Sequence, residues 1–537
     1  MFDWVRMPLS YGWSLKRFFQ HPISPKECDQ QITRQIQQRA VSFLRIVERG
    51  IFAHDRSPYR RLLHHAGIEF EDVSRLVRQE GLEAALTRLY RAGVYVTLDE
   101  FKGRQPIQRS GLQFLAQPQD FDNPLLAAAY EAETGGSRGA GTRVLIDLDL
   151  LSHEAAYHAL FLAAFSLDRC PIGVWLPVLP GVIATKLMLC YAKLGKPVER
   201  WFTQSKLAIG PGSYKSFLFT QGAVYGSRWW GTPLAAPEHV PLADAGRVVE
   251  WLVKKKAQGT PALLVTNPSS AVRVCQAAQE LGFDIAGTFF HVAGEPYTPA
   301  KAQVITASGG RAKGFYGMAE IGIVGMACAT PTTLLDEVHV FSDKLAIIQQ
   351  ERPIGIDGRR VGALFYSTLL PSCPKLMLNV DNGDYAVLDQ RTCGCAFERV
   401  GFHQHLHTIR SYEKLTSEGM TFLGSQFLAL VEEILPARFG GSPTDYQFVE
   451  EEEGGLPKVS LFVSPRVGPI DEAQLTTAVL HELRIDSKAE RMMADRWREG
   501  QTLRIVRREP YATHAAKVLP LHVLRNAQLL RGRDLAD

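Results

Sequence analysis

The sequence predicts an α/β protein with a large N-terminal domain, built on parallel-rich sheets flanked by helices, and a small C-terminal α+β domain. At 537 residues the chain is too long for one compact core, so two or more domains are expected. Strand-like and helix-like segments alternate through its centre, which is typical of a parallel sheet covered by helices. From about residue 411 this pattern changes. We therefore expect a large domain over 1–410 and a small domain over 411–537.

We expect the N-terminal region, about 1–110, to be helical. Within residues 29–50, apolar side chains such as Ile32 and Ile36 recur at near-helical spacing, which predicts an amphipathic helix. A second, apolar helix is expected over about 155–168.

The centre of the chain predicts strands and helices in alternation. Residues 261–266 are apolar and predict a short buried strand, and Asn-Pro-Ser-Ser at 267–270 supplies the turn and cap of a helix. Residues 288–293 predict the next strand, and Thr298-Pro299 is a cap with proline at the first helical position.

A third strand is expected to end at residues 314–317. In open parallel sheets, ligands bind beyond the carboxyl ends of the strands. This rule places Glu295 and residues 316–320 together at one binding edge.

The C-terminal part of the chain has the pattern of a compact α+β unit. Residues 446–451 and 459–463 alternate in hydrophobicity around a Glu-Glu-Gly-Gly turn, which predicts a hairpin. An amphipathic helix over about 471–484 and a short strand at 503–506 complete the unit.

Composition is that of an ordinary globular protein, with 46% apolar and 22% charged residues and a formal charge of +4. Nothing in it requires nucleic acid or an acidic membrane as a partner. No apolar run is long enough to cross a bilayer, and the first residues lack a signal pattern. Eight dispersed cysteines indicate reduced thiols, so we expect a cytoplasmic protein.

A glycine-rich loop lies between two apolar stretches that we expect to be helical. Glycines, hydroxyls and arginines are concentrated there, and successive N–H groups in such a loop can bind phosphate oxygens. The candidate ligand residues are Thr134, Gly135, Gly136, Ser137, Gly139 and Thr142. The spacing of the common nucleotide loop fails and its lysine is missing, so a flexible polar surface loop is the alternative.

Five motifs occur in an order that resembles the adenylate-forming superfamily, and within it the phenylacetate-CoA ligase branch. They are the glycine-rich loop, Gly294-Glu295-Pro296, Phe315-Tyr316-Gly317-Met318-Ala319-Glu320, Asn382-Gly383-Asp384 and Ala516-Lys517. The resemblance covers about residues 40–525. It implies that ATP activates a carboxylic acid as an acyl-adenylate with release of pyrophosphate.

The resemblance also implies roles for single residues. The glycine-rich loop would hold the β- and γ-phosphates, and Gly294, Glu295 and Pro296 would lie beside the adenine. Tyr316, with Phe315, Gly317 and Met318 around it, would stack on the base.

Four charged residues complete the implied site. Glu320 would coordinate the magnesium bound to ATP, and Asp384 would accept both ribose hydroxyls. Arg410 would contact the nucleotide at the domain junction. Lys517, on a mobile small domain, would bridge the substrate carboxylate and the α-phosphate.

The sequence departs from the superfamily pattern at several of these positions. Ala319 stands where a threonine contacts the α-phosphate, and Asn382 replaces the commoner threonine. Tyr412 occupies the hinge position, which is usually aspartate or lysine. Arg138 brings a charge to the loop that either faces phosphate or faces solvent.

The acid pocket is expected between the central sheet and the helix after residue 215. Aromatic density there favours an aryl or apolar acid, with His291 orienting a polar substituent or the carboxylate. Candidate lining residues are Phe289, Phe290, His291, Met318, Ile321 and either Trp229 or Trp230, and packing in the core is the alternative for each of them.

The resemblance gives coenzyme A as the expected acyl acceptor. A carrier-protein thiol, an amine or a hydroxyl would suit the same activated anhydride, and a non-catalytic nucleotide-binding protein is a third hypothesis. An oligomer is compatible with the sequence.

Cysteines and histidines in one region suggest a zinc site. The candidate ligands are Cys373, Cys393, Cys395 and His403. The Cys-x-Cys spacing differs from the usual Cys-x-x-Cys, so packed thiols and exposed imidazoles are the alternative.

Overall fold

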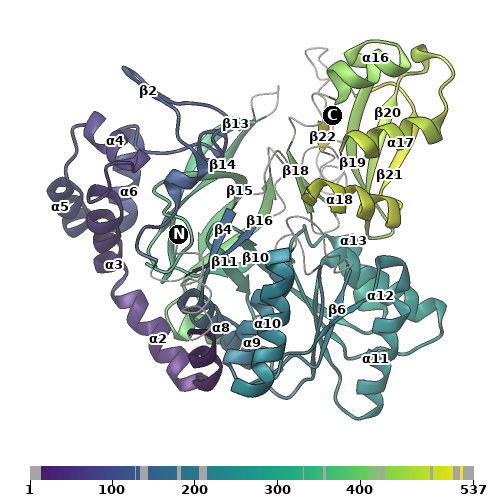
Figure 1. The fold of residues 1–537 in the computed structure, drawn as a ribbon, viewed down its shortest axis with the longest axis horizontal. Coiled ribbons are helices and arrows are strands. Elements are labelled where there is room, and N and C mark those ends of the chain that lie inside the picture. The colour runs from purple at the N-terminus through teal and green to yellow at the C-terminus, as the bar shows by residue number, and fades with distance from the viewer. Residues whose placement is uncertain are drawn as a thin grey trace, which may run out of the picture.

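The computed structural model describes most of the chain. The described ranges are 14–126, 129–133, 143–177, 183–204, 214–330, 332–354, 359–411, 414–417, 420–423, 430–483, 488–511 and 521–523. They form a mixed α/β structure with a large helix-flanked sheet and a smaller C-terminal unit, so the predicted fold class is confirmed (Figure 1). In this part of the chain, no helix combines the length and the hydropathy needed to cross a bilayer.

Short helices make up the N-terminal region, drawn in purple in Figure 1. The predicted 29–50 helix is divided into three consecutive pieces, the last of them π-helical. Ser24 begins the first piece through a capping box with Glu27, and Pro25 occupies its first helical position. The elements are α2 (Pro25–Gln37), α3 (Arg39–Ile46), η1 (Val47–Phe52), α4 (Pro58–His65), α5 (Phe70–Glu80), α6 (Leu82–Arg91) and α7 (Leu98–Phe101).

Twelve strands form one sheet in the order β13-β14-β15-β16-β12-β11-β10-β9-β8-β5-β6-β7. From β10 to β7 all pairs are parallel. The strands of this parallel half are β5 (Ile172–Trp175), β6 (Arg200–Thr203), β7 (Pro237–His239), β8 (Leu263–Thr266), β9 (Phe289–Val292) and β10 (Arg311–Met318). The parallel strands predicted at 261–266 and 288–293 are therefore present.

From β10 to β13 all pairs are antiparallel, and this half ends on the N-terminal helices. Its strands are β11 (Gly322–Ala327), β12 (Val338–Val340), β13 (Leu345–Ile354), β14 (Arg359–Thr368), β15 (Val380–Gln390) and β16 (Gln404–Ser411). One end of β15 and β16 lies near Asp384 and the other end lies near Cys393 and Cys395. These two strands therefore connect two groups of functional side chains that lie far apart.

Helices cover the parallel half on both faces. Asn267 is the N-cap of α12 and Thr298 caps α13, as predicted. The helices are α8 (Leu148–Ala164), α9 (Ile183–Lys193), α10 (Tyr214–Trp230), α11 (Gly246–Ala257), α12 (Pro268–Glu280) and α13 (Pro299–Ala307). Two separate apolar cores result: Phe289 belongs to one and Phe290 to the other, because consecutive strand residues point to opposite faces.

The residues that flank the glycine-rich loop are strands rather than the helices expected from the sequence. β3 (Ala129–Glu133) and β4 (Arg143–Asp147) pair antiparallel, with Glu133 opposite Arg143. α8 then begins directly after β4, capped by Asp147. Two further hairpins are β1 (Ile107–Arg109) with β2 (Leu112–Phe114), and β17 (Lys414–Ser417) with β18 (Met420–Leu423).

The C-terminal unit has its own apolar core and a four-stranded sheet in the order β21-β20-β19-β22. The predicted hairpin is β19 (Tyr446–Glu453) and β20 (Leu456–Val463), and the predicted helix and strand are α17 (Glu472–Glu482) and β21 (Leu503–Arg507). The unit also contains η4 (Leu430–Ile434), α16 (Leu435–Phe439), η5 (Pro443–Asp445), η6 (Pro465–Val467), α18 (Lys488–Glu499) and β22 (Leu521–Val523). In the larger part of the chain, η2 (Pro118–Phe121), η3 (Leu242–Asp244) and α14 (Ala396–Arg399) are short connecting helices.

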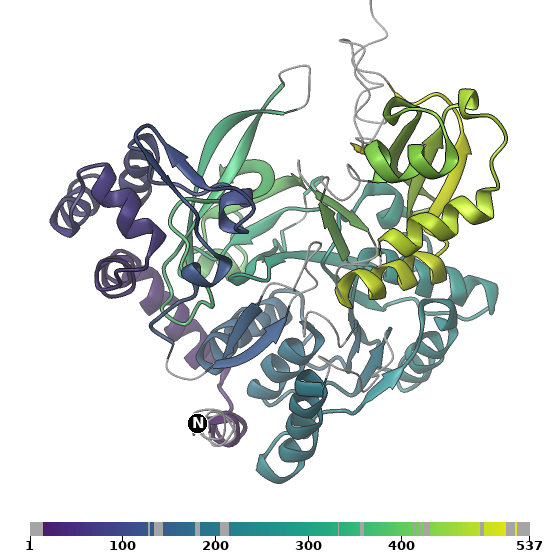
Figure 2. The ribbon, with the colours of Figure 1, turned by 45° about the horizontal axis from the view of Figure 1, so that its top comes forward.

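The C-terminal unit rests on α12 and α13 of the large domain (Figure 2). The hairpin turn at Gly455 approaches Lys301, and Thr298 donates to Glu452 at 2.7 Å. Arg496 of α18 donates to Gln204 after β6. The two units therefore meet beside the segment that follows β9.

Candidate active site

The last residues of β10 and the first half of β15 meet at the carboxyl ends of the parallel strands. The Tyr316 hydroxyl donates to Asp384 Oδ2 at 2.6 Å and lies 3.0 Å from the Tyr366 hydroxyl. Asn382 Nδ2 donates to the same carboxylate oxygen at 2.9 Å, and Ser411 Oγ donates to Oδ1 at 2.7 Å. Both oxygens of Asp384 are thus directed toward hydrogen-bond donors.

Burial, together with the neighbouring Asp384 carboxylate, raises the pKa of Tyr316 well above its usual value. The phenol therefore stays neutral and keeps its hydrogen over the whole physiological range. A neutral tyrosine next to a carboxylate that accepts hydrogen bonds offers an aromatic face and a hydroxyl-binding group in one place.

Glu320 lies just beyond β10 and is almost completely buried. Lys102, directly after α7, donates to Glu320 Oε1 at 2.5 Å. The N-terminal helical region thus contributes a cation to this edge, which no motif in the sequence indicated.

A buried ion pair holds the turn between β10 and β11. Glu154 of α8 accepts the Ile323 N–H at 2.7 Å and the Lys344 ammonium at 3.0 Å. Lys344 also donates to the Ile321 carbonyl at 2.9 Å. Gly322 has φ +77°, and a Cβ there would lie 1.9 Å from Glu154 Oε1, so only glycine fits.

Burial alone would raise the pKa of Glu154, but Lys344, Lys186 and the Ile323 N–H together more than offset this, and the pKa lies below its usual value. The carboxylate is therefore ionised and keeps its partners. This ion pair fixes the position of the backbone that carries Glu320.

The Gly294-Glu295-Pro296 segment follows β9, and Gly294 has φ +91°. Glu295 accepts the Ser269 N–H at 2.5 Å, at the N-terminus of α12, where the helix dipole favours a carboxylate. Lys301 donates to the Pro296 carbonyl at 3.0 Å and lies 3.8 Å from Glu295. The segment is therefore held by the positive N-terminus of α12 on one side and by the ammonium of Lys301 on the other.

Carboxylates of the C-terminal unit face this segment. Glu452 lies 3.6 Å from Lys301. Burial raises the pKa of Glu450 to about 7, with Lys301 opposing the shift and Glu295 adding to it. The contact between the two units is therefore sensitive to protonation.

Arg410, near the end of β16, donates to Asp336 at 2.8 Å. Asp336 also accepts the N–H groups of Thr408 and Ile409, each at 3.0 Å. This aspartate therefore fixes the backbone conformation near the end of β16.

His291 is completely buried in β9, and its ring stacks on Phe161 at 3.7 Å. Burial lowers its pKa well below the usual value, so the imidazole is neutral. Phe289 shares this face of the sheet, whereas Phe290 points into the opposite core. Phe290 and His291 therefore cannot line one pocket together.

Two other candidates for the acid pocket are also corrected. Trp229 is 87% exposed, and Ile321 is buried in the core under the antiparallel half.

Several predicted ligands lie outside the described residues. They are the glycine-rich loop residues Thr134, Gly135, Gly136, Ser137, Gly139 and Thr142, together with Arg138, Tyr412 and Lys517. Their roles stay predictions. Lys102, Asp336 and Ser411, which the structure brings to the site, are single polar residues without a local pattern, so sequence reasoning had no signal for them.

Four sulfur and nitrogen ligands gather at the opposite end of the antiparallel strands. Cys328, His339, Cys393 and Cys395 have their ligand atoms within 4.8 Å of one another. The predicted set is corrected at two positions, because Cys373 is buried in a different core and His403 is 62% exposed beside Glu398. Cys328 and His339 are brought in by the pairing of β11 with β12, which spacing along the chain does not reveal.

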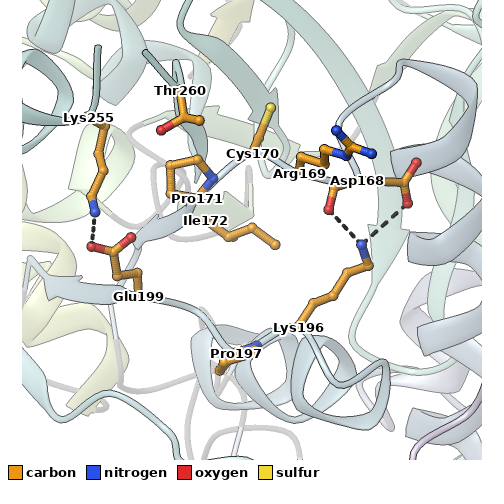
Figure 3. A pocket seen from close by; sticks show the side chains of 10 residues that line it. All are labelled: Asp168, Arg169, Cys170, Pro171, Ile172, Lys196, Pro197, Glu199, Lys255 and Thr260. Atoms are coloured by element: carbon orange, nitrogen blue, oxygen red, sulfur yellow. Dashed lines mark hydrogen bonds and ion pairs between the residues drawn. The ribbon is translucent and has the colours of Figure 1, made fainter. Parts of the chain in front are cut away.

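An open pocket of about 480 Å³ lies at the amino ends of β5, β6 and β8 (Figure 3). Lys196 pairs there with Asp168 at 3.4 Å, and Lys255 pairs with Glu199. The pocket lies at the edge opposite to the one where ligands bind in parallel sheets, and these cations already have partners.

The fold is similar to that of a 2-hydroxyisobutyryl-CoA ligase in complex with 2-HIB-AMP and CoA in the thioesterification state. The TM-score is 0.51 with 17% identity, covering 94% of this chain and 93% of that chain. Lower TM-scores relate it to the amide bond synthetase McbA from Marinactinospora thermotolerans (0.39, 13% identity, 86% and 91% covered) and to the o-succinylbenzoate CoA synthetase MenE from Bacillus subtilis (0.36, 12% identity, 73% and 67% covered).

No protein-family model and no curated protein sequence matches the chain. The first structural likeness extends over nearly the whole of both chains. It shows that this chain shares its fold with that CoA ligase, as the sequence predicted.

Proposed function

We propose that this protein activates a carboxylic acid with ATP and transfers the acyl group to the thiol of coenzyme A. The carboxylate oxygen attacks the α-phosphorus, the bond to pyrophosphate breaks, and the thiol then displaces AMP from the acyl carbon. The observation that carries the proposal is the 2.6 Å contact between Tyr316 and Asp384 at the carboxyl edge of the sheet, with Glu320 just beyond the same strand.

The donor set around Asp384 fits a ribose. Its two oxygens accept hydrogen bonds from Tyr316, Asn382 and Ser411, and the two hydroxyls of a ribose are donors of the same kind. A bound nucleotide would exchange these side-chain donors for its own. Tyr316 would then offer its aromatic face to the adenine.

Glu320 fits a magnesium ion that arrives with ATP. Its carboxylate is the hard oxygen ligand that Mg²⁺ prefers, and it already binds a cation, the ammonium of Lys102. The metal would neutralise phosphate charge. In its absence Lys102 balances the charge of Glu320.

Lys517 and the glycine-rich loop complete the proposal. Lys517 would place a cation between the substrate carboxylate and the α-phosphate, and Ser137, Thr142 and backbone N–H groups would hold the leaving pyrophosphate. An aryl or apolar acid is the proposed substrate class, because of the aromatic residues Phe161, Phe289 and Phe315 around β9.

The test is exchange of labelled pyrophosphate into ATP with a panel of carboxylic acids. At least one acid should support exchange, and Lys517→Ala should lower the rate by at least about 100-fold while ATP binding persists. Lys254→Ala, an exposed lysine on α11, is the matched control and should keep the rate.

Two outcomes would change the proposal. Exchange without any thioester on addition of coenzyme A would assign the acyl group to an amine, a hydroxyl or a carrier protein. No exchange with any acid, together with tight ATP binding, would favour a nucleotide-binding protein without catalysis.

A further inference from the structure

We propose that Cys328, His339, Cys393 and Cys395 bind one structural zinc ion. Their ligand atoms lie within 4.8 Å of one another, and three of the four residues are buried. In a tetrahedral site with Zn–S of about 2.3 Å and Zn–N of about 2.0 Å, a sulfur and a nitrogen lie about 3.6 Å apart. His339 Nε2 lies 3.1 Å from the Cys395 sulfur and 3.6 Å from the Cys393 sulfur.

The tautomer of His339 suits a metal ligand. Its Nδ1 lies 2.9 Å from the Phe402 carbonyl oxygen, which can only accept, so Nδ1 carries the hydrogen. Nε2 therefore directs a lone pair toward the sulfurs. Metal-bound histidines are generally oriented by such a hydrogen bond from the ring nitrogen that does not bind the metal.

The turn that carries two of the thiols is held by its own contacts. Glu398 accepts the N–H groups of Cys393, at 2.8 Å, and of Gly394. Gly394 has φ +72°, and Thr330 donates to the Cys393 carbonyl at 2.7 Å. The Cys-Gly-Cys turn is therefore fixed with both sulfurs on the side of His339.

A cation lies beside the cluster. Arg391 Nη2 donates to the Cys328 sulfur at 3.4 Å and is paired with Glu337 at 2.6 Å. Three thiolates around a divalent cation leave one negative charge, which Arg391 would balance. Three sulfurs and one imidazole in a closed set favour zinc over magnesium or calcium.

The role is structural because the site is closed and remote. Four protein ligands fill a tetrahedral zinc, and β11 separates Cys328 from the Glu320 end by about 20 Å of extended chain. The cluster joins the end of β15 to β11 and β12, with β16 lying between them in the sheet. Zinc would therefore tie together strands that are not neighbours.

The test is metal analysis of the purified full-length chain produced with zinc in the medium. We expect about one zinc per chain, and at least about tenfold less in Cys395→Ser. Cys373→Ser is the matched control: this buried thiol lies outside the cluster and should leave the zinc content unchanged.

A second measurement covers the case in which Cys395→Ser does not fold. Cobalt added to the zinc-stripped wild-type chain should give the intense visible absorption of a tetrahedral thiolate site. Less than about a tenth of a zinc per chain without a cobalt spectrum would overturn the proposal, and so would equal zinc loss in Cys373→Ser and Cys395→Ser.

Discussion

The two ends of β11 are held by different chemistry. At Gly322 the strand begins beside Glu154 and Lys344, and the preceding Glu320 pairs with Lys102. At the other end, Cys328 joins two further cysteines and His339 around a closed centre. Ion pairs and hydrogen bonds can exchange partners when a charged ligand arrives, whereas a closed four-ligand site has no open position. The Gly322 end of β11 is therefore suited to binding and releasing a charged ligand, and the Cys328 end is suited to holding one metal ion permanently.

The variant with the largest expected effect removes the negative charge of Glu320, just before β11. Glu320→Gln should lower the pyrophosphate exchange rate by about 100-fold or more, because the carboxylate proposed for magnesium is lost. Zinc content should be unchanged, because the cluster lies beyond the other end of the strand. Loss of zinc in this variant would show that the two ends are not independent.

Alanine substitutions of two glycines on β11 form a matched pair of variants, for which we expect a smaller loss of activity or zinc than for Glu320→Gln. In Gly322→Ala the new Cβ would lie 1.9 Å from Glu154 Oε1, and in Gly325→Ala it would lie 2.2 Å from the His339 carbonyl oxygen. We expect each to cost about 1–3 kcal/mol of unfolding free energy. Gly322→Ala should mainly reduce exchange activity, and Gly325→Ala should mainly reduce bound zinc.

Thermal unfolding, metal content and exchange rate measured together would separate these effects. If both variants lost activity and zinc in the same proportion, the strand would behave as one unit and the comparison of its ends would fail.

The smallest expected effect concerns the contact between the two units. The pKa of Glu450 is raised from 4.5 to about 7, so the folded protein binds this proton more tightly than the unfolded chain. The stabilisation is complete below about pH 4.5 and is lost as pH rises to about 7. After correction for the intrinsic, base-catalysed rate, hydrogen exchange at the β19–β20 hairpin should therefore accelerate by up to about tenfold per pH unit within this window.

Glu450→Gln should remove that slope, because a neutral amide does not titrate. Glu295, Glu452, Lys301 and Arg410 also face Glu450, and an unchanged slope would show that Glu450 is not the source of the pH dependence.

Much of the fold followed from local sequence patterns. The strands at 261–266 and 288–293, the caps at Asn267 and Thr298 and the C-terminal hairpin are encoded within a few residues each. The antiparallel half was not predicted, because its strands pair across long stretches of sequence. The strand β3 before the glycine-rich loop was mistaken for helix, because apolar residues there fit both periods.

The same distinction holds for the candidate sites. Tyr316, Glu320 and Asp384 could be proposed from the sequence because each lies in a short motif with a recognisable order, and the structure brings Tyr316 and Asp384 into contact. Cys328 and His339 were missed, although Cys393 and Cys395 were identified, because only the pairing of β11 with β12 brings all four together. Chemistry that is assembled by sheet topology leaves no spacing to detect.

The ion pair between Lys102 and Glu320 has a consequence for the sequence of binding events. A free magnesium ion would have to displace an ammonium from a nearly buried carboxylate before gaining any phosphate ligand. A metal already chelated by ATP arrives with its charge partly compensated, and its phosphates offer Lys102 a new partner. Under the proposed function, magnesium would therefore bind together with ATP as one complex. Free magnesium would not bind to Glu320 before the nucleotide does.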